Sequence, residues 1–225
     1  MLVKNWMSKT VITTDVNDSM NKVMDLMKEY DIGMVPVMKK GKLVGIVTDR
    51  DLKRSSASDA TTLEIHELLF LISKIKVKDI MTKDPITVPF DFTVEEAAEI
   101  LMKNRISGAP VVDQNGKVVG TITKGDLFRV LISSTGVGKR GIQFAFQVED
   151  LPGTIKDVAD IIRHYGGRML SILSSYENVP KGYRNVFIRM YGVERDKLPQ
   201  LEDDIRKKAT LLYVVDHREN KREIF

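Results

Sequence analysis

The sequence predicts a mixed α/β fold of the α+β kind, with two α-β-β-α repeats packed as a pair and a separate C-terminal domain. Three observations lead to this fold class. The phrase GIVTDRDL at 45–52 returns as GTITKGDL at 120–127. The match extends over residues 6–52 and 80–127. After residue 141 the pattern changes to elements in the order β-α-β-β-α-β.

Each repeat is predicted from its helix caps and apolar spacing. In the second copy, Thr93 and Glu96 form a capping box. An apolar helical stripe follows at Val94, Ala97, Ala98 and Leu101. In the first copy the N-cap is Ser19, and the stripe is Met20, Val23, Met24 and Met27. Two strands joined by a tight turn follow in each copy, and a second helix begins at the Thr-x-x-Asp of the repeated phrase. Two such units are expected to cover each other's apolar faces.

Composition narrows the class of protein. The chain has 225 residues, of which 43% are apolar and 29% charged, as in ordinary soluble domains. Cysteine is absent, which excludes disulfides and thiolate chemistry. We see no apolar run of the roughly 18 residues that a membrane helix needs and no signal peptide, so we expect a cytoplasmic protein.

Charge gives no sign of a polyanionic partner. The net charge of +4 comes from 35 basic and 31 acidic residues that are interspersed through most of the chain. Nucleic-acid binding would favour a dense basic stripe with aromatic platforms, which the sequence lacks. We therefore expect no nucleic-acid and no membrane partner.

The repeated phrase has two interpretations. A threonine before a helix with an aspartate three residues later is a modified capping box, which needs no ligand. The same geometry also suits a nucleotide, because a helix N-terminus attracts phosphate and an acid can accept hydrogen bonds from a ribose diol. Gly45 and Gly120, on the preceding strand, allow close approach of backbone or ligand.

These residues resemble the CBS domain, and the tandem over about residues 1–135 resembles a CBS pair, or Bateman module. The resemblance implies adenosine ligands (AMP, ADP or ATP) in clefts between the repeats, with the aspartate at the ribose and the threonine at the phosphate. The implied binding residues are Val11, Ile12, Met34, Val35, Thr48 and Asp51 in the first copy and Pro85, Ile86, Ala109, Pro110, Thr123 and Asp126 in the second. Candidates for phosphate charge are Arg50, Lys53, Lys124 and Arg129.

We place the domain boundaries by this pattern. Repeat 1 covers 1–54, a helical insert 55–76, repeat 2 77–134 and a linker 135–140, and the C-terminal domain with a short tail covers 141–225. The insert is strongly apolar on one face and suggests packing within the module or a dimer. The second copy is closer to the usual CBS pattern, because the first lacks a proline in its lead-in and has Met34 where the second has Gly108.

The β-α-β-β-α-β order of the C-terminal domain is the ferredoxin-like pattern. Together with the turn Asp150-Leu151-Pro152-Gly153, it resembles an ACT domain over about 141–217. That resemblance implies a dimer interface and an amino-acid site at Asp150, Leu151, Gly153 and Thr154; the other reading of the turn is a plain connector. The whole architecture resembles the AcuB-type proteins linked to acetoin utilisation.

The sequence indicates no catalytic centre. It contains none of the common nucleotide-hydrolysis, zinc-protease or serine-hydrolase motifs. His66, His164 and His217 lie far apart and lack partners at metal spacing. We therefore expect no enzyme, no catalytic residue and no metal site. Three readings stay open: an adenine-nucleotide sensor acting as a homodimer, a dimeric scaffold that holds a partner enzyme with its CBS clefts empty, and an amino-acid sensor acting through the ACT turn.

Overall fold

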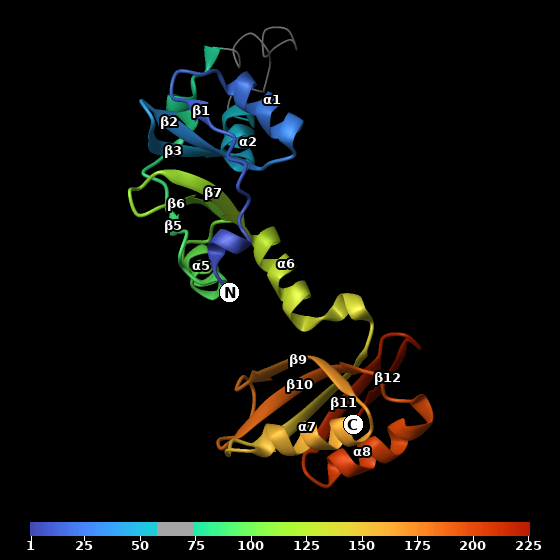
Figure 1. The fold of residues 1–225 in the computed structure, drawn as a ribbon. Coiled ribbons are helices and arrows are strands. Elements are labelled where there is room, and N and C mark those ends of the chain that lie inside the picture. Colours follow the sequence, from blue (N-terminus) through green and yellow to red (C-terminus); the bar gives the residue numbers. More distant parts are fainter. Residues whose placement is uncertain (58–73) are drawn as a thin grey trace. The chain divides into compact units, whose positions relative to one another are not determined.

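The computed structural model of the protein describes residues 1–57 and 74–225 (Figure 1). The chain divides into two compact units, Met1–Phe128 and Arg129–Phe225. Most of the predicted insert at 55–76, including His66, lies outside the described residues. The predicted mixed α+β fold is confirmed.

The first repeat has the predicted order α-β-β-α. Its elements are α1 (Met20–Tyr30), β2 (Met34–Lys39), β3 (Lys42–Thr48) and α2 (Asp49–Ala57). The short lead-in strand β1 (Thr14–Asp15) pairs with β2 in parallel. Ser19 is the N-cap of α1, since its hydroxyl accepts a hydrogen bond from the Lys22 N–H at 3.3 Å. Met20, Val23 and Met27 of the predicted stripe pack onto β2 and β3, whereas Met24 is 42% exposed and lies outside this core.

The second repeat repeats this order. Its elements are α5 (Val94–Lys103), β6 (Gly108–Val112), β7 (Val118–Thr123) and α6 (Lys124–Thr135). The lead-in strand β5 (Val88–Pro89) is parallel to β6. The predicted capping box is present: Thr93 accepts from the Glu96 N–H at 3.2 Å, and Glu96 accepts from the Thr93 N–H at 2.7 Å. The helix starts of both repeats are thus fixed by local sequence.

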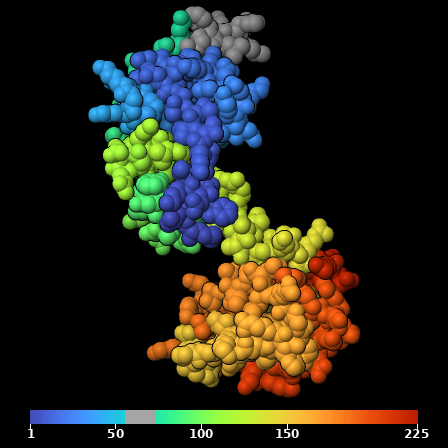
Figure 2. Space-filling view, in the orientation of Figure 1, coloured from blue at the N-terminus to red at the C-terminus, as the bar shows by residue number. Residues whose placement is uncertain are grey.

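The segment that leads into each repeat packs in the core of the other repeat. Val3, in the 3-10 helix η1 (Val3–Asn5), is fully buried against the second repeat, and Figure 2 shows these N-terminal residues (blue) against it (green). Val77, in α4 (Val77–Ile80), is fully buried in the core of the first repeat. The strand β4 (Thr82–Lys83) pairs with β3 of the first repeat. Each core is completed by an exchanged segment.

The C-terminal unit is a five-stranded antiparallel sheet in the order β12-β11-β8-β10-β9, with two helices on one face (Figure 1). The elements are η2 (Val137–Lys139), β8 (Ile142–Glu149), α7 (Thr154–His164), β9 (Arg168–Ser175), β10 (Tyr183–Tyr191), η3 (Arg195–Lys197), α8 (Leu198–Arg206), β11 (Thr210–Asp216) and β12 (Lys221–Ile224). Phe144 and Phe146 on β8 meet Ile162 of α7 and Leu201 of α8 in the core. The β-α-β-β-α-β order is confirmed, and β12 is an addition that we did not predict. Helix α6 extends to Thr135, at the start of the predicted linker.

Candidate functional site

The two Thr-x-x-Asp motifs have nearly identical geometry in the two repeats. Thr48 ends β3, and Asp51 lies in the first turn of α2. One carboxylate oxygen of Asp51, Oδ2, accepts from the Thr48 N–H at 2.9 Å and from its hydroxyl at 2.7 Å. In the second repeat Oδ2 of Asp126 accepts from the Thr123 N–H at 2.7 Å and from its hydroxyl at 2.8 Å. The backbone N–H of each aspartate donates back to the threonine hydroxyl, at 3.4 Å and 3.3 Å. Both motifs therefore cap their helices.

Capping does not use up the acceptor capacity of the carboxylate. An ionised carboxylate has about four lone-pair sites, and the cap occupies two of them, both on Oδ2. Within residues 1–57 and 74–225, no hydrogen bond is made to Oδ1 of Asp51. The side chain of Asp51 is half-buried, and Asp126 is 8% exposed. The capping role and a ribose-binding role of Asp51 are thus compatible.

The threonine hydroxyls are more fully engaged than the resemblance implies. Each donates its only hydrogen to the aspartate and accepts from the aspartate N–H. A hydroxyl in this state has no hydrogen for a phosphate oxygen. Phosphate contact by Thr48 or Thr123 would therefore require the cap bond to be exchanged, whereas the helix N-terminus itself remains favourable for an anion.

The start of the middle strand lies beside the motif in each repeat. Met34 is the cross-strand partner of Thr48, and Gly108 is that of Thr123. A Cβ built on Gly108 would stand 3.0 Å from Cγ2 of Thr123, so a side chain at this position adjoins the motif threonine. Met34 supplies such a side chain, half-buried, in the first repeat only. This is the clearest difference between the two motif sites.

The predicted base-pocket residues fall into two groups. Val11, Ile12 and Pro85 are half-buried and Ile86 is 39% exposed, all in segments that cross from one repeat to the other. Ser8, just before the first crossing, is hydrogen-bonded to Thr121 of β7. The second group comprises Val35, Ala109 and Pro110, which are buried. Residues of the first group can meet a ligand with their side chains. In the second group, Val35 and Ala109 pack in the cores of their repeats, whereas Pro110 lies on the opposite face of β6 from Ala109.

The group that lies close to each motif glycine, Gly45 or Gly120, is another part of the protein chain. A Cβ on Gly45 would lie 2.6 Å from Sδ of Met81, and a Cβ on Gly120 would lie 2.5 Å from Sδ of Met7. Both methionines belong to the exchanged segments. The two glycines thus admit the lead-in of the opposite repeat rather than a ligand.

The four basic residues that were predicted to face a phosphate differ in their contacts. Lys53 forms an exposed ion pair with Asp49, at 3.3 Å. Arg50, Lys124 and Arg129 are exposed at the starts of α2 and α6. Exposed pairs contribute little to stability, so Lys53 can change partner at small cost.

The turn that was predicted to bind an amino acid lies between β8 and α7. Gly153 has φ of 97°, which favours glycine, and the Thr154 hydroxyl lies 3.1 Å and 3.0 Å from the carbonyl oxygens of Glu149 and Leu151. Leu151 is 53% exposed. The carboxylate of Asp150 accepts from the Tyr176 hydroxyl at 3.3 Å. These contacts hold the turn in place, and they are the ones expected of a connector.

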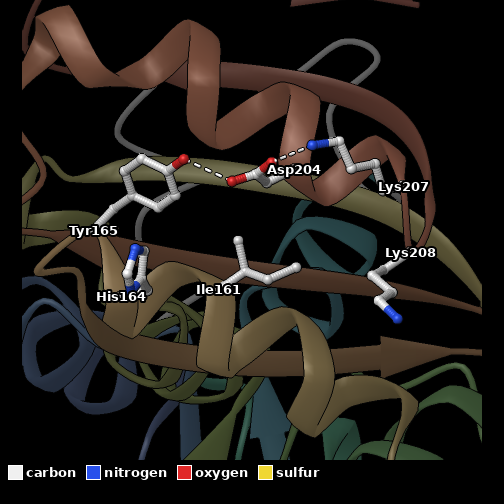
Figure 3. Close-up of a pocket in the computed structure, with 6 residues that line it drawn as sticks. All are labelled: Ile161, His164, Tyr165, Asp204, Lys207 and Lys208. Carbon is white, nitrogen blue, oxygen red and sulfur yellow. Dashed lines mark hydrogen bonds and ion pairs between the residues drawn. The ribbon is translucent and has the colours of Figure 1, made fainter.

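A small pocket of about 190 Å³ lies between α7 and α8 (Figure 3). Sequence reasoning gave no sign of it, because its lining comes from the ends of two helices that are distant in sequence. Asp204 accepts from the Tyr165 hydroxyl at 2.6 Å and from Lys207 at 2.7 Å. The hydrogen bonds from Lys207 and Tyr165 lower the pKa of Asp204, and the pKa of Tyr165 is raised in turn. Its one carboxylate is thus already neutralised. Lys207 and Lys208, which follow the C-terminal end of α8, are the usual complement of a helix dipole.

The part of the chain that the structure describes shows neither a metal-binding cluster nor a membrane-spanning helix. There, no group of three or more His, Cys, Asp or Glu side chains is placed to hold a metal ion. None of the described helices is long and apolar enough to cross a bilayer.

The first unit of the chain is a tandem-repeat module. It consists of two α-β-β-α repeats that exchange their lead-in segments and carry the same Thr-x-x-Asp cap on their second helices. A family model for the CBS domain matches residues 3–58 and 77–133, half of the chain. The chain therefore belongs to the CBS domain family, with a C-terminal part of α and β structure that this model does not cover.

Relatives share the same region. The uncharacterised protein MJ1426 of Methanocaldococcus jannaschii is 32% identical over an alignment 155 residues long, and the match covers 59% of this chain and 92% of that protein. An inosine-5'-monophosphate dehydrogenase of Korarchaeum cryptofilum is 38% identical over 125 residues, but these are 23% of that enzyme. The crystal structure of the CBS domain pair of protein MJ0100, in complex with 5'-methylthioadenosine and S-adenosyl-L-methionine, is similar with a TM-score of 0.50 and 32% identity, over 58% of this chain and 99% of that one.

Proposed function

We propose that the protein is a non-catalytic regulatory sensor that binds an adenosine-containing ligand between its CBS repeats. The observation that carries the proposal is the doubled Thr-x-x-Asp cap at two helix N-termini, in a chain that belongs to the CBS family. A similar CBS pair has been solved with two adenosine compounds bound. The dehydrogenase match is restricted to a minor part of that enzyme, which supports a regulatory rather than a catalytic role.

The proposed contacts follow from the chemistry of such ligands. Methylthioadenosine and S-adenosylmethionine contain adenine and ribose but no phosphate, so the adenosine part is what they share with AMP, ADP and ATP. We assign ribose recognition to Asp51 and Asp126, because a carboxylate can accept from both hydroxyls of a ribose diol. The N-termini of α2 and α6, with Arg50 and Lys124 nearby, would favour the phosphates of a nucleotide. Val11, Ile12, Met34, Pro85, Ile86 and Pro110 would line the space for the base.

We further propose that the C-terminal unit is an ACT-type domain that makes the protein a homodimer and passes on the ligand state, as in the AcuB-type architecture. Its β-α-β-β-α-β order supports this assignment. A ligand changes such an equilibrium only by binding one arrangement of the module more tightly than another. A partner enzyme would then sense the arrangement that the ligand favours.

The test compares ligand binding by Asp51→Asn, Asp126→Asn and the double variant. Asparagine can keep the cap, since its amide oxygen accepts both threonine hydrogen bonds, but it replaces the second oxygen by a donor. Calorimetric titration with AMP, ADP, ATP, NAD, S-adenosylmethionine and methylthioadenosine should give binding to the wild type, and the double variant should lose it. If the double variant binds as tightly as the wild type, the ribose assignment is wrong. If no adenosine compound binds the wild type, the sensor proposal fails.

One observation favours an alternative. Both aspartates are already satisfied as caps without a ligand. The second candidate function is therefore a dimeric scaffold with empty CBS clefts, or an amino-acid sensor that acts through Asp150, Leu151, Gly153 and Thr154. It predicts no response to adenosine compounds in the same titrations, and the sensor form predicts binding of a small amino acid that Gly153→Ala weakens.

A further inference from the structure

The sheet of the C-terminal unit has a second face, opposite the helices. Along β8 the residues Ile142, Phe144 and Phe146 point into the core, so Gln143 and Ala145 point to the other face. By the same alternation Arg189 of β10 lies on this outer face, directly across from Gln143. Val215 of β11 is the other neighbour of Gln143. His217, two residues further on, continues the same face.

Arg189 is a buried cation on this face, and within residues 1–57 and 74–225 it has no carboxylate partner. It is 4% exposed. Its Nε donates to the carbonyl oxygen of Thr135 at 2.8 Å, and Nη2 donates to Oε1 of Gln143 at 3.0 Å. The third nitrogen, Nη1, is buried and has no hydrogen-bond partner among the described residues. Buried charges in proteins are almost always paired, and an orphan donor on one costs more than on a neutral group.

A second orphan nitrogen lies on the same face. The His217 N–H donates to the Gly141 carbonyl oxygen at 3.2 Å, which continues the β11–β8 ladder. Its ring nitrogen Nε2 is buried and has no partner in the described part of the chain. From strand spacing, the Cα atoms of Arg189 and His217 are roughly 12 Å apart, with Gly141 and Gln143 between them. Both side chains can therefore reach over β8 toward each other.

Positive charge dominates around these two groups. Burial lowers the pKa of His217, and the charges of Arg189 and Arg222 lower it further, while Asp216 acts in the opposite direction. The Asp216 carboxylate points to the helix face, where Arg195 holds it at 2.9 Å. Thr135 is the last residue of α6, so its carbonyl brings about half a negative charge to Arg189. Among the residues that the structure describes, no carboxylate is hydrogen-bonded to Arg189 to supply the remainder.

We propose that Arg189, Gln143 and His217 form a binding site for a small oxyanion, a carboxylate or phosphate group, on the outer face of this sheet. Nη1 of Arg189, the side-chain amide of Gln143 and Nε2 of His217 are the three donors. Gln143 and His217 are only half-buried, so the anion reaches the site from solvent beside them. The site is independent of the CBS motifs and of the Asp150 turn.

The test follows the Cε1–H signal of His217 by carbon-correlated NMR of the full chain. Sodium phosphate and sodium acetate are added separately at fixed pH, with sodium chloride keeping the ionic strength constant. We expect a saturable shift of His217 and a rise of its pKa, because a bound anion favours the charged ring. His164, on the helix face of the same domain, is the internal control. A larger response to phosphate or to acetate identifies the preferred group. If His217 moves no more than His164 with either anion, the proposal is overturned and water bridges the two nitrogens.

The decisive variant is Gln143→Glu, which places a carboxylate 3.0 Å from Nη2 of Arg189 without a change of size. It supplies the missing negative charge from within the chain. We expect a higher unfolding midpoint than the wild type and loss of the His217 response to both anions. Val215→Thr is a matched control that alters the same face without charge, and it should keep the response. A Gln143→Glu protein that is less stable and still responds would contradict the site.

Discussion

At the scale of single residues, Gly45 and Gly120 show how the two repeats are joined. A side chain at Gly45 would meet Sδ of Met81, the far end of a flexible side chain, and the Thr82 carbonyl oxygen at 3.1 Å. At Gly120 the Ser8 carbonyl oxygen would lie 2.7 Å away, and backbone cannot move aside. We expect Gly120→Ala to cost about 1–3 kcal/mol of unfolding free energy and Gly45→Ala to cost less.

Urea unfolding of the two variants measures this difference. Gly125→Ala is the matched control, since an added Cβ there meets only the Thr123 hydroxyl at 3.5 Å. Gly125 lies in helix α6, so this control should be neutral or more stable by up to about 1 kcal/mol. Equal costs at Gly45 and Gly120 would show that the exchanged segments adjust with equal ease.

Asp216 gives a residue-scale prediction for pH. Burial of its carboxylate opposes ionisation, but the hydrogen bonds from Arg195 and from the Arg218 and Glu219 N–H groups outweigh burial and lower its pKa. A group whose pKa is depressed in the folded state stabilises the fold above its unfolded pKa and loses this contribution as the pH falls through the folded value. Asp216→Asn should therefore destabilise the protein at neutral pH by about 1.5–3 kcal/mol, the range for hydrogen bonds to charged groups.

The difference between the Asp216→Asn variant and the wild type should shrink as the pH falls below the ordinary aspartate range. Urea unfolding at a series of pH values follows it. A difference that is constant from neutral to acidic pH would mean that packing at this position, rather than charge, supports the fold.

At the scale of elements, each short exchanged helix belongs energetically to the repeat in which it is buried. Val3 of η1 and Val77 of α4 are both fully buried. Truncation of a buried valine removes contacts worth about 1.5–3 kcal/mol. We expect Val3→Ala to increase amide hydrogen exchange in α5 and β7, and Val77→Ala to increase it in α1 and β2.

The two variants are controls for each other in this hydrogen-exchange experiment. If Val3→Ala loosens both repeats equally, they open as one cooperative unit and the two cores are not separable. The outcome decides whether each exchanged segment stabilises only the repeat in which it is buried, or whether the two repeats form one shared core.

Prediction from sequence succeeded where structure is set locally. The caps at Ser19 and Thr93, the doubled phrase and the β-α-β-β-α-β order all depend on residues a few positions apart, so their patterns are visible in one sequence. The burial of Val3 in the second repeat and of Val77 in the first depends on contacts between distant segments. The apolar periodicity of each repeat would be the same whichever core its lead-in segment joined, so the sequence pattern could not reveal this exchange. For the same reason, the sequence could not show whether Gly45 and Gly120 are approached closely by the backbone of the protein or by a ligand. The buried positions of Val35 and Ala109 likewise became visible only in the folded cores.

At the scale of the whole molecule, the proposed sensor requires ligand binding and self-association to be linked. Each of the two compact units has its own core, so ligand information can reach a C-terminal dimer interface only as a coupling free energy. Linkage is reciprocal: a ligand that tightens the dimer tenfold is itself bound tenfold more tightly by the dimer, which corresponds to about 1.4 kcal/mol.

We expect the apparent Kd of the adenosine ligand to fall as the concentration of the full-length protein is raised through its dimerisation range. Sedimentation velocity and calorimetric titration of the same samples measure the two equilibria. A Kd that is the same for monomer and dimer would separate nucleotide binding from assembly, and the C-terminal unit would then act as a scaffold without reading the CBS pair.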